Sequence, residues 1–515
     1  MSMAGQHLSR AAGWLASFKD ELVGNGRIDR LADDLIGNNA EIAGPFGRKA
    51  LVYADYVASG RALFSVERFV LEKILPYYAN SHTEASYCGG FMTGFREAAR
   101  RVIADSCGAD ESHAVIFAGS GATAGLNRLV NLFGVNARSA DGARPRVVIG
   151  PYEHHSNILP WRESGAEIVE IREGPDGDLD LDDLDRRLAE SKERPVICAF
   201  SAASNVTGII SDVVEITRRA NAAGARIIWD YAGAGPYLPI KLRPADDASI
   251  DAVVISPHKF IGGPAASGVL IVRRDAVESR KPTWPGGGTV KFVSPTVHDY
   301  SESLEAREEG GTPNVIGDIR AALAFLVKEA IGQNNFVPRN AALSKRALSA
   351  WSKIDRIQIL GNLRAERLPI VSFRIKDGKG GYVHHQLITR MLSDLYGIQA
   401  RGGCACAGPY VHRLLDIDEM ESSQLRQAIA AGDEIRKPGF TRLNFSVLLS
   451  DDKVQYILDS VAQLAQNATK FLDCYTVDRS RAIFYPRDMT EQTSRSTADV
   501  AGPRRRTNRE MSGAT

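Results

Sequence analysis

The stretch DAVVISPHKFIGGPAASGVLIV, residues 251–272, contains two short apolar runs separated by a turn that carries a lysine, Lys259. Short apolar runs bounded by turn residues are typical of buried strands. Further runs of this kind alternate with helical patterns from about residue 112 to residue 273. Such alternation predicts an α/β domain with a mostly parallel sheet.

Composition limits the classes of protein to which the chain can belong. It has 515 residues, 44% of them hydrophobic, which is enough for a large core and more than one domain. Sixty-three basic residues nearly balance 62 acidic ones, so the formal charge of +1 gives no reason to expect nucleic acid or a membrane surface as a partner. No apolar run approaches the roughly 20 residues of a membrane helix. The six cysteines are scattered except for one close pair, which indicates a reducing, cytoplasmic location.

Changes in pattern along the chain predict four segments. They are an N-terminal helical segment at 1–48, a large α/β domain at 49–335, a smaller α+β domain at 336–475 and a C-terminal extension at 476–515. Beyond about residue 487 the extension is rich in Ser, Thr and Arg and poor in apolar residues, which predicts disorder. Its GPRRRTNR run also fits a nuclear or nucleic-acid signal, but a solvated tail is the simpler interpretation.

Two charged residues lie at the ends of apolar strand patterns. Lys259 comes after DAVVIS, and Asp230 closes RIIWD. Binding crevices of open α/β sheets form at the strand ends, so we expect both side chains at one edge of the sheet. A desolvated lysine favours its neutral, nucleophilic amine, and a carboxylate can keep a pyridinium nitrogen protonated. A surface lysine in a turn and a helix-capping aspartate are the ordinary alternatives.

Two other junctions between strand and helix carry small or polar residues. GSGATAGLN, residues 119–127, offers backbone N–H groups and the Thr123 hydroxyl to a phosphate, although a simple tight turn has the same pattern. EHHSN, residues 153–157, places two histidines on an extended segment, where they point apart and make a poor metal pair. A histidine ring stacked on an aromatic cofactor fits this pattern better than a metal site does. The ordinary alternative is a histidine with a purely structural role. We expect no metal site.

A glycine-rich loop in the second domain carries the close pair of cysteines. RGGCACAGP, residues 401–409, places Cys404 and Cys406 among small neighbours, and Arg401 nearby favours a thiolate. No second cysteine pair is present to complete a zinc site. A nucleophile with a companion thiol, a redox pair and two inert loop cysteines are all consistent with this spacing.

Seven motifs, in order along the chain, resemble those of the class V branch of fold-type I pyridoxal-phosphate enzymes, the group of cysteine desulfurases and selenocysteine lyases. The motifs are EHHSNILPW, SNVTG, the strand ending at Asp230, SPHK, REEGGTPN, RGGCACA and TRLNFS. The likeness runs from YADYVASGRAL at 53–63 to about residue 472. It implies a large domain with a mostly parallel, seven-stranded sheet, followed by a smaller α+β domain.

The resemblance also implies roles in binding pyridoxal 5'-phosphate. Lys259 is expected to bind the cofactor covalently and to move the substrate's α proton, Asp230 to pair with the pyridine nitrogen, and His154 to stack on the ring. The expected phosphate-binding residues are Ala122, Thr123, Ser256, His258 and, from the neighbouring subunit, Thr312. This last assignment implies a homodimer with shared active sites.

Roles in handling substrate and sulfur follow from the same resemblance. Asn205 is expected beside the cofactor's phenolic oxygen and the substrate, and Arg442 is expected to bind the substrate carboxylate. Cys406, five residues after Arg401, occupies the position of the nucleophile that takes sulfur from L-cysteine as a persulfide and leaves L-alanine. The sulfur would then pass to a thiol acceptor such as a carrier protein. Cys404 is a candidate for resolving or protecting the persulfide.

Three departures from the family pattern leave other reactions open. Gly233 stands where glutamine is usual, Ala122 replaces the first threonine of a phosphate-binding pair, and RLNFSVLLS differs from the usual segment at the substrate arginine. The alternatives are a selenocysteine or other C–S lyase, and an aminotransferase or epimerase of specialised metabolism on the same scaffold. A cofactor-binding regulator without turnover is a further class. The joint retention of Lys259, Asp230, Arg442 and Cys406 argues against it.

Overall fold

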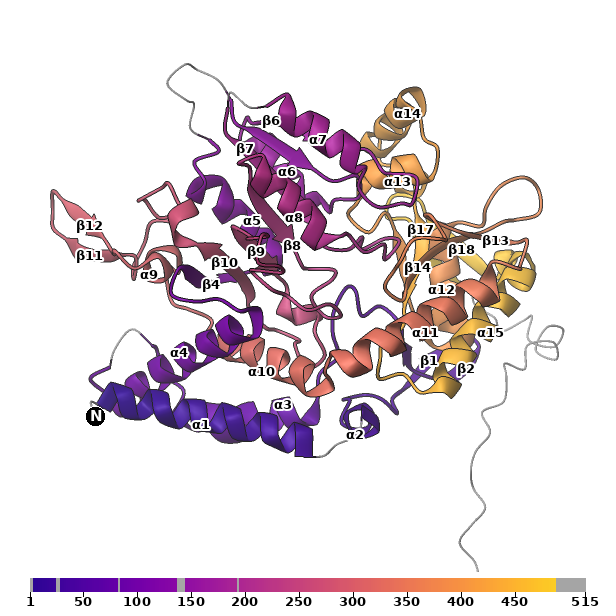
Figure 1. Ribbon diagram of the computed structural model, residues 1–515. Coiled ribbons are helices and arrows are strands. Elements are labelled where there is room, and N and C mark those ends of the chain that lie inside the picture. Colours follow the sequence, from indigo (N-terminus) through magenta and orange to yellow (C-terminus); the bar gives the residue numbers. More distant parts are fainter. Residues whose placement is uncertain (1–2, 25–27, 82–83, 137–143, 192–193, 488–515) are drawn as a thin grey trace, which may run out of the picture.

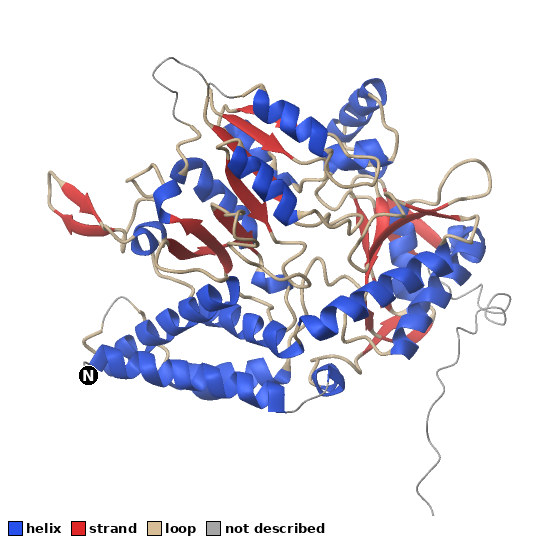
Figure 2. Ribbon diagram, in the orientation of Figure 1, coloured by secondary structure: helices blue, strands red, loops and turns tan. Residues whose placement is uncertain are grey.

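A computed structural model describes residues 3–24, 28–81, 84–136, 144–191 and 194–487. Its centre is a seven-stranded sheet with the order β4-β10-β9-β8-β7-β5-β6, and helices flank it (Figures 1 and 2). All neighbouring strands are parallel except β10, which is antiparallel to β9 and to β4. The predicted α/β fold with a mostly parallel seven-stranded sheet is confirmed. The strands are β4 (His113–Gly119), β5 (Arg146–Ile149), β6 (Glu167–Glu170), β7 (Val196–Ser201), β8 (Arg226–Asp230), β9 (Ala252–Ile255) and β10 (Gly268–Arg273).

Strand β9 shows why the central strands are apolar throughout instead of alternating. Val253 and Ile255 pack in the apolar cluster on one face of the sheet, and Ala252 and Val254 pack in the cluster on the other face. All four side chains are 0% exposed. Because both faces are covered, successive side chains are buried regardless of the side to which they point. Each large apolar side chain buried in this way stabilises the fold by roughly 1.5–3 kcal/mol.

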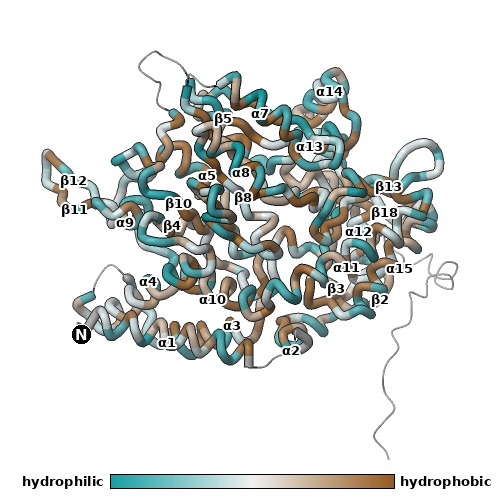
Figure 3. The backbone as a smooth tube through the Cα atoms, in the orientation of Figure 1, coloured by the Kyte–Doolittle hydropathy of each residue, from teal (hydrophilic) through white to brown (hydrophobic). Residues whose placement is uncertain are grey.

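Helices connect the parallel strands, and longer helices form a layer below them in Figure 1. The connecting helices are α5 (Gly121–Leu132), α6 (Leu159–Glu163), α7 (Leu181–Ala189) and α8 (Val213–Ala222). In the lower layer, α1 (Met3–Gly24) packs along α4 (Tyr87–Cys107), and both contact α10 (Val315–Ile331), along which hydrophobic residues run (Figure 3). Leu15 and Phe18 of α1 are 1% and 4% exposed within the core of the large unit. The N-terminal helix therefore packs on the large unit.

The second unit is built on an antiparallel sheet with the order β13-β14-β17-β16. A separate apolar cluster that contains Trp351, Phe373 and Tyr396 forms its core. We propose that the chain enters this unit at Gly332, the N-cap of the helix Gln333–Trp351, where the sequence predicts a change of domain near residue 335. Its elements are α11 (Gln333–Trp351), β13 (Ile357–Ile359), β14 (Ile370–Ile375), α12 (His385–Tyr396), β16 (Arg401–Gly403), α13 (Gly408–Leu414), α14 (Glu419–Ala430), β17 (Phe440–Asn444) and α15 (Asp451–Asn467).

Two segments beyond the predicted limits also pack on the second unit. The hairpin of β18 (Tyr475–Asp478) and β19 (Ile483–Pro486) contacts α12, and the Phe484 ring lies 5.2 Å from that of His384. We therefore propose that this unit extends through Pro486, because a boundary at 475 would cut the hairpin at its first residue. The disorder predicted beyond about 487 falls on residues outside those described.

The segment before the large unit contributes to the second unit as well. The hairpin of β1 (Glu41–Gly44) and β2 (Gly47–Ala50) contacts α12, and β3 (Val52–Tyr53) pairs in parallel with β15 (Ile398–Gln399). The Phe46 ring lies 5.9 Å from that of Phe471. We propose that residues 41–54 belong with the second unit, which places YADYVASG where the two units meet.

Three short helices and a two-stranded hairpin complete the large unit. They are α2 (Ile28–Asp33), α3 (Phe64–Phe69), α9 (Leu304–Glu308), β11 (Val290–Val293) and β12 (His298–Tyr300). The β11–β12 hairpin extends away from the body of the molecule at the left of Figure 1, and Phe292 and Val293 on it are 53% and 62% exposed. Among the described residues, no helix has the length and apolar content that crossing a membrane requires.

Candidate active site

A cavity of about 210 Å³ lies at the carboxyl ends of β7, β8 and β9, between the sheet and the second unit. Most residues predicted to act on cofactor or substrate line it, although they are spread over more than 300 positions of the sequence. Those residues are Ala122, Thr123, His154, Asn205, Asp230, Ser256, His258, Lys259 and Arg442.

Lys259 lies on the 3-10 turn Pro257–Lys259, directly after β9. Burial lowers the pKa of its ammonium to about 8, although the carboxylate of Asp230 opposes this effect. Amine and ammonium are therefore both populated near pH 8, and the side chain can serve as a nucleophile and as a base. Gly60 admits this turn: its N–H donates to the His258 carbonyl at 2.9 Å, and a Cβ there would lie 1.8 Å from the Phe260 oxygen.

Asp230 ends β8 and is 4% exposed. Its Oδ1 accepts a hydrogen bond from the Ala232 N–H at 2.7 Å. Burial raises the pKa of this carboxyl, while that hydrogen bond and the positive charge of Lys259 lower it. A buried carboxylate beside the cavity gains stability from a protonated ring nitrogen bound next to it.

The start of α5 forms one wall of the cavity with hydroxyl groups. The Ala122 N–H donates to Ser256 Oγ at 2.9 Å, and Thr123 Oγ1 lies 2.7 Å from Ser156 Oγ. Gly121 has φ +61°, and a Cβ on it would lie 3.0 Å from both Ser256 Oγ and His258 Cε1. Backbone N–H groups at a helix N-terminus beside three hydroxyls suit a phosphate. Ser156 supplies a hydroxyl in the region where Ala122 lacks one.

His154 precedes the 3-10 turn His155–Asn157 and lines the cavity. The Ser156 N–H donates to its Nδ1 at 3.1 Å, so Nδ1 is the acceptor and the neutral ring carries its proton on Nε2. Burial, with Lys259 as the next cause, lowers the pKa of His154 to about 3. The ring is therefore neutral at physiological pH, as stacking on a cationic pyridinium ring favours.

Glu153 holds the EHHSN segment to the end of β7 through buried hydrogen bonds. It is 2% exposed and accepts hydrogen bonds from the Ser201 N–H at 2.9 Å, the Ser201 hydroxyl at 2.6 Å and Asn157 Nδ2 at 2.7 Å. Burial raises the pKa of this carboxyl to about 7 despite these bonds. From the sequence, the EHHSN motif indicates a role only for its histidines. No local pattern shows that Glu153 holds this segment to β7 or that Ser156 forms part of the cavity wall.

Arg442 is 2% exposed on β17. One guanidinium nitrogen donates to Asp55 Oδ1 at 2.8 Å and another to the Asn205 carbonyl at 2.9 Å, while Nε has no partner among the described residues. Asp55 belongs to the YADYVASG motif and was not assigned a role from the sequence. The arginine is thus held in place at the cavity with hydrogen-bonding capacity left for a carboxylate.

Asn205 links the cavity to the cysteine loop. Its Nδ2 donates to the Ala405 carbonyl at 2.8 Å, whereas its Oδ1 is buried and has no partner in the described part of the chain. A side chain at Gly233 would approach this asparagine, since a Cβ there would lie 3.7 Å from Asn205 Cβ. Buried polar atoms are rarely left unpaired, so Asn205 Oδ1 indicates a missing polar ligand. With Asp230, Lys259 and the hydroxyls of Thr123, Ser156 and Ser256, it fits pyridoxal phosphate.

Cys406 and Cys404 are both partly buried, and neither lines the cavity, although Ala405 between them does. Ala405 and Cys406 have φ values of 49° and 56°. For non-glycine residues this left-handed conformation costs roughly 1–2 kcal/mol each. The loop therefore carries the predicted nucleophile to the edge of the cavity in a strained backbone.

Thr312 is exposed and does not line the cavity of its own chain. Its segment is fixed to the large unit by Glu309, which accepts from the Phe117 N–H at 2.7 Å and pairs with Arg96 and Arg100 at 2.6 and 2.8 Å. The role of Thr312 in a neighbouring active site stays a prediction.

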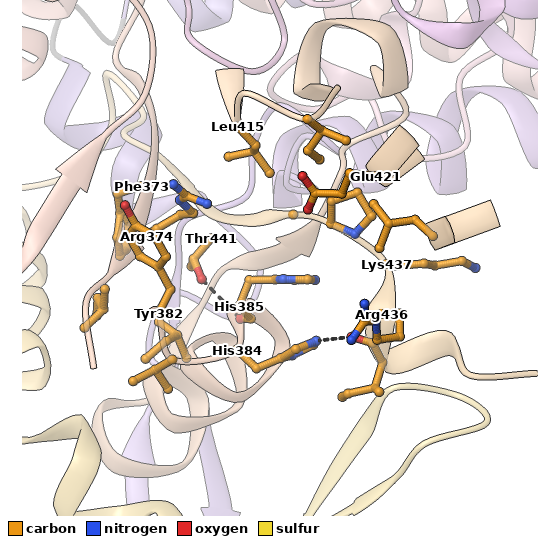
Figure 4. Close-up of a pocket in the computed structure, with 18 residues that line it drawn as sticks. Phe373, Arg374, Tyr382, His384, His385, Leu415, Glu421, Arg436, Lys437 and Thr441 are labelled. Atoms are coloured by element: carbon orange, nitrogen blue, oxygen red, sulfur yellow. Dashed lines mark hydrogen bonds between the residues drawn. The ribbon is translucent and has the colours of Figure 1, made fainter. Parts of the chain in front are cut away.

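A second cavity, of about 330 Å³, lies on the second unit between β14, the start of α12 and α14 (Figure 4). Its wall includes His384, whose Nε2 lies 3.1 Å from the Ile435 carbonyl, and Arg374, which stacks 3.6 Å from the Tyr382 ring. None of the residues predicted to be catalytic or to bind cofactor lines this cavity. Within the described residues, no group of three or more His, Cys, Asp or Glu could hold a metal ion.

Comparisons with known proteins agree with this geometry. The family model for class-V aminotransferases matches residues 52–432. A cysteine desulfurase of Enterobacter sp. (strain 638) is 31% identical over 364 residues, which cover 70% of this chain and 85% of that protein. A probable cysteine desulfurase of Halalkalibacterium halodurans is 29% identical over 371 residues, covering 71% and 86%.

Solved structures show the same fold. An apo cysteine desulfurase from Thermococcus onnurineus superposes with a TM-score of 0.68 and 24% identity, covering 85% of this chain and 98% of that one. A cysteine desulfurase from Escherichia coli gives a TM-score of 0.67 and 22% identity, covering 86% and 99%. These likenesses, the family model and the arrangement of the cavity all indicate one assignment. The chain belongs to the class-V aminotransferase family.

Proposed function

We propose that this protein is a pyridoxal-phosphate-dependent cysteine desulfurase, which converts L-cysteine to L-alanine and transfers the sulfur as a persulfide on Cys406 to a thiol acceptor. The observation that carries the proposal is the position of the Cys406 loop, which Asn205 holds against the cavity that contains Lys259, Asp230 and Arg442. The curated relatives of similar sequence are named as cysteine desulfurases.

The cofactor would be held by residues from three junctions of the large unit. Lys259 would bind its aldehyde and Asp230 its ring nitrogen. Its phosphate would be bound at the start of α5 by the hydroxyls of Thr123, Ser156 and Ser256, and by His258. When bound, pyridoxal phosphate supplies an electron-withdrawing ring that acidifies the substrate's α C–H. Asn205 Oδ1, buried without a partner among the described residues, would gain a polar neighbour on binding.

Arg442 and Lys259 would prepare the amino acid. The guanidinium would bind the substrate carboxylate in place of part of its contact with Asp55, which fixes the α carbon near Lys259. The amine form of Lys259, whose pKa burial lowers to about 8, would take the α proton and return a proton at a later stage.

Cys406 would perform the sulfur transfer. Its thiolate attacks the sulfur of the bound cysteine, an S–S bond forms on Cys406, and the C–S bond breaks with its electron pair remaining on carbon. That carbon takes up a proton and leaves as part of alanine. The persulfide then passes its outer sulfur to an acceptor thiol, with Cys404 two residues away as a candidate for protecting or resolving it.

One observation supports a second candidate, a selenocysteine or other C–S lyase. Ala405 lines the cavity and Cys406 does not, so a reaction without an obligatory persulfide also fits this arrangement. Gly233 lines the cavity without a side chain, so the space beside Asn205 could accept a substrate larger than cysteine. The reaction would then be that of an aminotransferase or an epimerase.

A single experiment separates these activities. The purified yellow protein is incubated with each amino acid in turn, and alanine, sulfide and keto acids are measured. A desulfurase forms alanine from L-cysteine, and Cys406→Ala lowers that rate by at least about a hundredfold. Undiminished alanine formation by Cys406→Ala supports a lyase, and keto-acid-dependent amino transfer supports an aminotransferase. Cys474→Ala, which removes a partly buried cysteine outside the loop, is the matched control and should leave the rate as in wild type.

The assembly and location that we propose follow from the same family. The active unit is a homodimer in which Thr312 of each chain serves the neighbouring site. The protein acts in the cytoplasm on a free amino acid and passes sulfur to a carrier protein.

A further inference from the structure

The loop that carries Cys406 depends on outside contacts for its shape. Ala405 and Cys406 are consecutive residues in the left-handed region, with φ values of 49° and 56°, and Gly403 has φ +123°. Consecutive non-glycine residues persist in this conformation only where surrounding contacts hold them. The groups that bind this loop therefore decide where the Cys406 thiol lies.

His155 makes two of three hydrogen bonds that hold the loop to the large unit. Its backbone N–H donates to the Cys406 carbonyl at 2.7 Å, and its ring Nε2 accepts from the Gly408 N–H at 2.9 Å. The third bond runs from Asn205 Nδ2 to the Ala405 carbonyl at 2.8 Å. Each loop residue from 405 to 408 except Ala407 is thus bound across the gap between the two units.

The ring of His155 supplies an acceptor that α13 lacks. Gly408 is the first residue of this helix, and its N-cap, Ala407, has no side-chain acceptor for the free N–H groups. Burial and the Arg162 guanidinium lower the pKa of His155, which keeps the ring neutral and its Nε2 lone pair available. The two histidines face different partners. Their ring centroids are 6.2 Å apart; His154 lines the cavity with Lys259, whereas His155 does not and binds the cysteine loop instead.

We propose that His155 is a latch for the catalytic loop, a positioning residue that holds Cys406 in its strained, closed place. Loss of the bond from Gly408 to the ring lets the left-handed backbone relax and exposes the Cys406 thiol. This role rests on the proposed function, in which Cys406 must meet substrate inside the cavity and then deliver sulfur to an acceptor outside it. Backbone strain at Ala405 and Cys406 favours an open loop, and the three hydrogen bonds to the large unit favour the closed one. The loss of one bond can therefore shift the equilibrium between the two states.

The test measures exposure of the thiol without turnover. Cys406 in the holoenzyme is alkylated with iodoacetamide, and the rate is read from the loop peptide by mass spectrometry. His155→Ala is expected to raise the rate about tenfold, because one hydrogen bond that holds the closed loop is lost. Gly408→Ala is expected to raise it similarly without touching EHHSN, because the new Cβ would lie 3.0 Å from His155 Nε2. His155→Gln retains an acceptor at similar reach, so its rate stays within about twofold of wild type.

Two further measurements distinguish a latch from general damage. The cofactor absorbance band and cofactor affinity of His155→Ala remain those of wild type, while kcat for alanine formation falls more than KM changes. Alkylation rates that are unchanged in both His155→Ala and Gly408→Ala overturn the proposal. Alkylation needs no desulfurase activity, so failure of wild type to form alanine from L-cysteine would remove the proposed function and leave the result on the latch standing.

Discussion

Lys259 and Asp230 influence each other's protonation. Burial lowers the pKa of Lys259 to about 8, and the nearby carboxylate limits that fall. Only the neutral amine attacks an aldehyde, and its fraction grows as the pH rises through the pKa. We therefore expect the rate at which cofactor-free protein binds pyridoxal phosphate to increase with pH, with a midpoint near 8, and then to level off. Stopped-flow absorbance measures this rate.

Asp230→Asn tests the cause of that midpoint. Without the carboxylate that stabilises the ammonium, the Lys259 pKa falls further and the midpoint moves to lower pH. A midpoint that stays in place would show that Asp230 does not influence the Lys259 pKa. A rate independent of pH would show that Lys259 is not the titrating group.

Ser156 is a second residue whose contribution can be measured alone. Its hydroxyl lies 2.7 Å from Thr123 Oγ1 and 3.1 Å from His154 Nδ1, while its N–H separately fixes the histidine. Ser156→Ala removes only the hydroxyl, so we expect cofactor affinity to fall about five- to tenfold with the fold intact. Fluorescence titration with pyridoxal phosphate gives the affinity. Asn127→Ala, on the same helix as Thr123 but outside the cavity lining, should bind as wild type does.

Residues at strand ends could be found from the sequence pattern, and Arg442 from the family resemblance, but contacts between distant segments could not be predicted. Lys259 and Asp230 each follow an apolar run, so a linear pattern placed them together. The contact of Arg442 with Asp55 joins positions 387 residues apart, and no local pattern announces it. Likewise the partner of His155 is Gly408, 253 residues later, so its role becomes visible only when the loop is in place.

At the scale of elements, a buried ion network ties α9 to the sheet and to α4. Glu309, directly after α9, is 8% exposed and pairs with Arg96 and Arg100 while it accepts the Phe117 N–H of β4. Burial alone would raise the pKa of this carboxyl, but Arg100 and Arg96 hold it below its ordinary value. The network explains how a short helix and the GGTPN turn after it keep a fixed position.

Glu309→Gln should therefore destabilise the protein through this element. Two buried guanidinium groups lose their shared countercharge, and we expect the free energy of unfolding to fall by about 3 kcal/mol. Urea unfolding followed by tryptophan fluorescence measures the change. Glu302→Gln is the matched control, since its side chain is 91% exposed and pairs with Lys291 only at 3.6 Å; it should shift stability by less than about 0.5 kcal/mol. Equal effects of the two variants would contradict the network.

The boundaries of elements were less predictable than their order. The alternation of apolar runs and helical patterns predicted the mostly parallel sheet, because burial on both faces makes each strand apolar throughout. The family resemblance implied its seven strands. The β18–β19 hairpin has no such signature: its residues are mostly part-exposed, and its place is set by contacts with α12. A short, partly exposed hairpin at the end of a unit was therefore predicted to be part of the extension.

At the scale of the whole molecule, the predicted role of Thr312 implies an active site that is not complete within one chain. It is exposed and outside its own cavity, while its segment is held firmly through Glu309. A fixed, exposed ligand residue is suited to the neighbouring site of a two-fold dimer. If it serves there, Lys259→Ala and Thr312→Ala subunits complement each other, because one of the two sites in a mixed dimer has both residues.

Mixing the two variants, at a cofactor concentration at which Thr312→Ala alone is nearly inactive, tests this arrangement directly. Random exchange makes half of the dimers mixed, each with one intact site, so about a quarter of the wild-type rate of alanine formation should return. Each variant incubated alone is the control for incomplete inactivation, and size-exclusion chromatography with light scattering verifies that dimers form and exchange. If Thr312 acts within its own chain, every site in a mixed dimer lacks one of the two residues. The mixture would then be no more active than the average of its components, and the shared site would have to be abandoned.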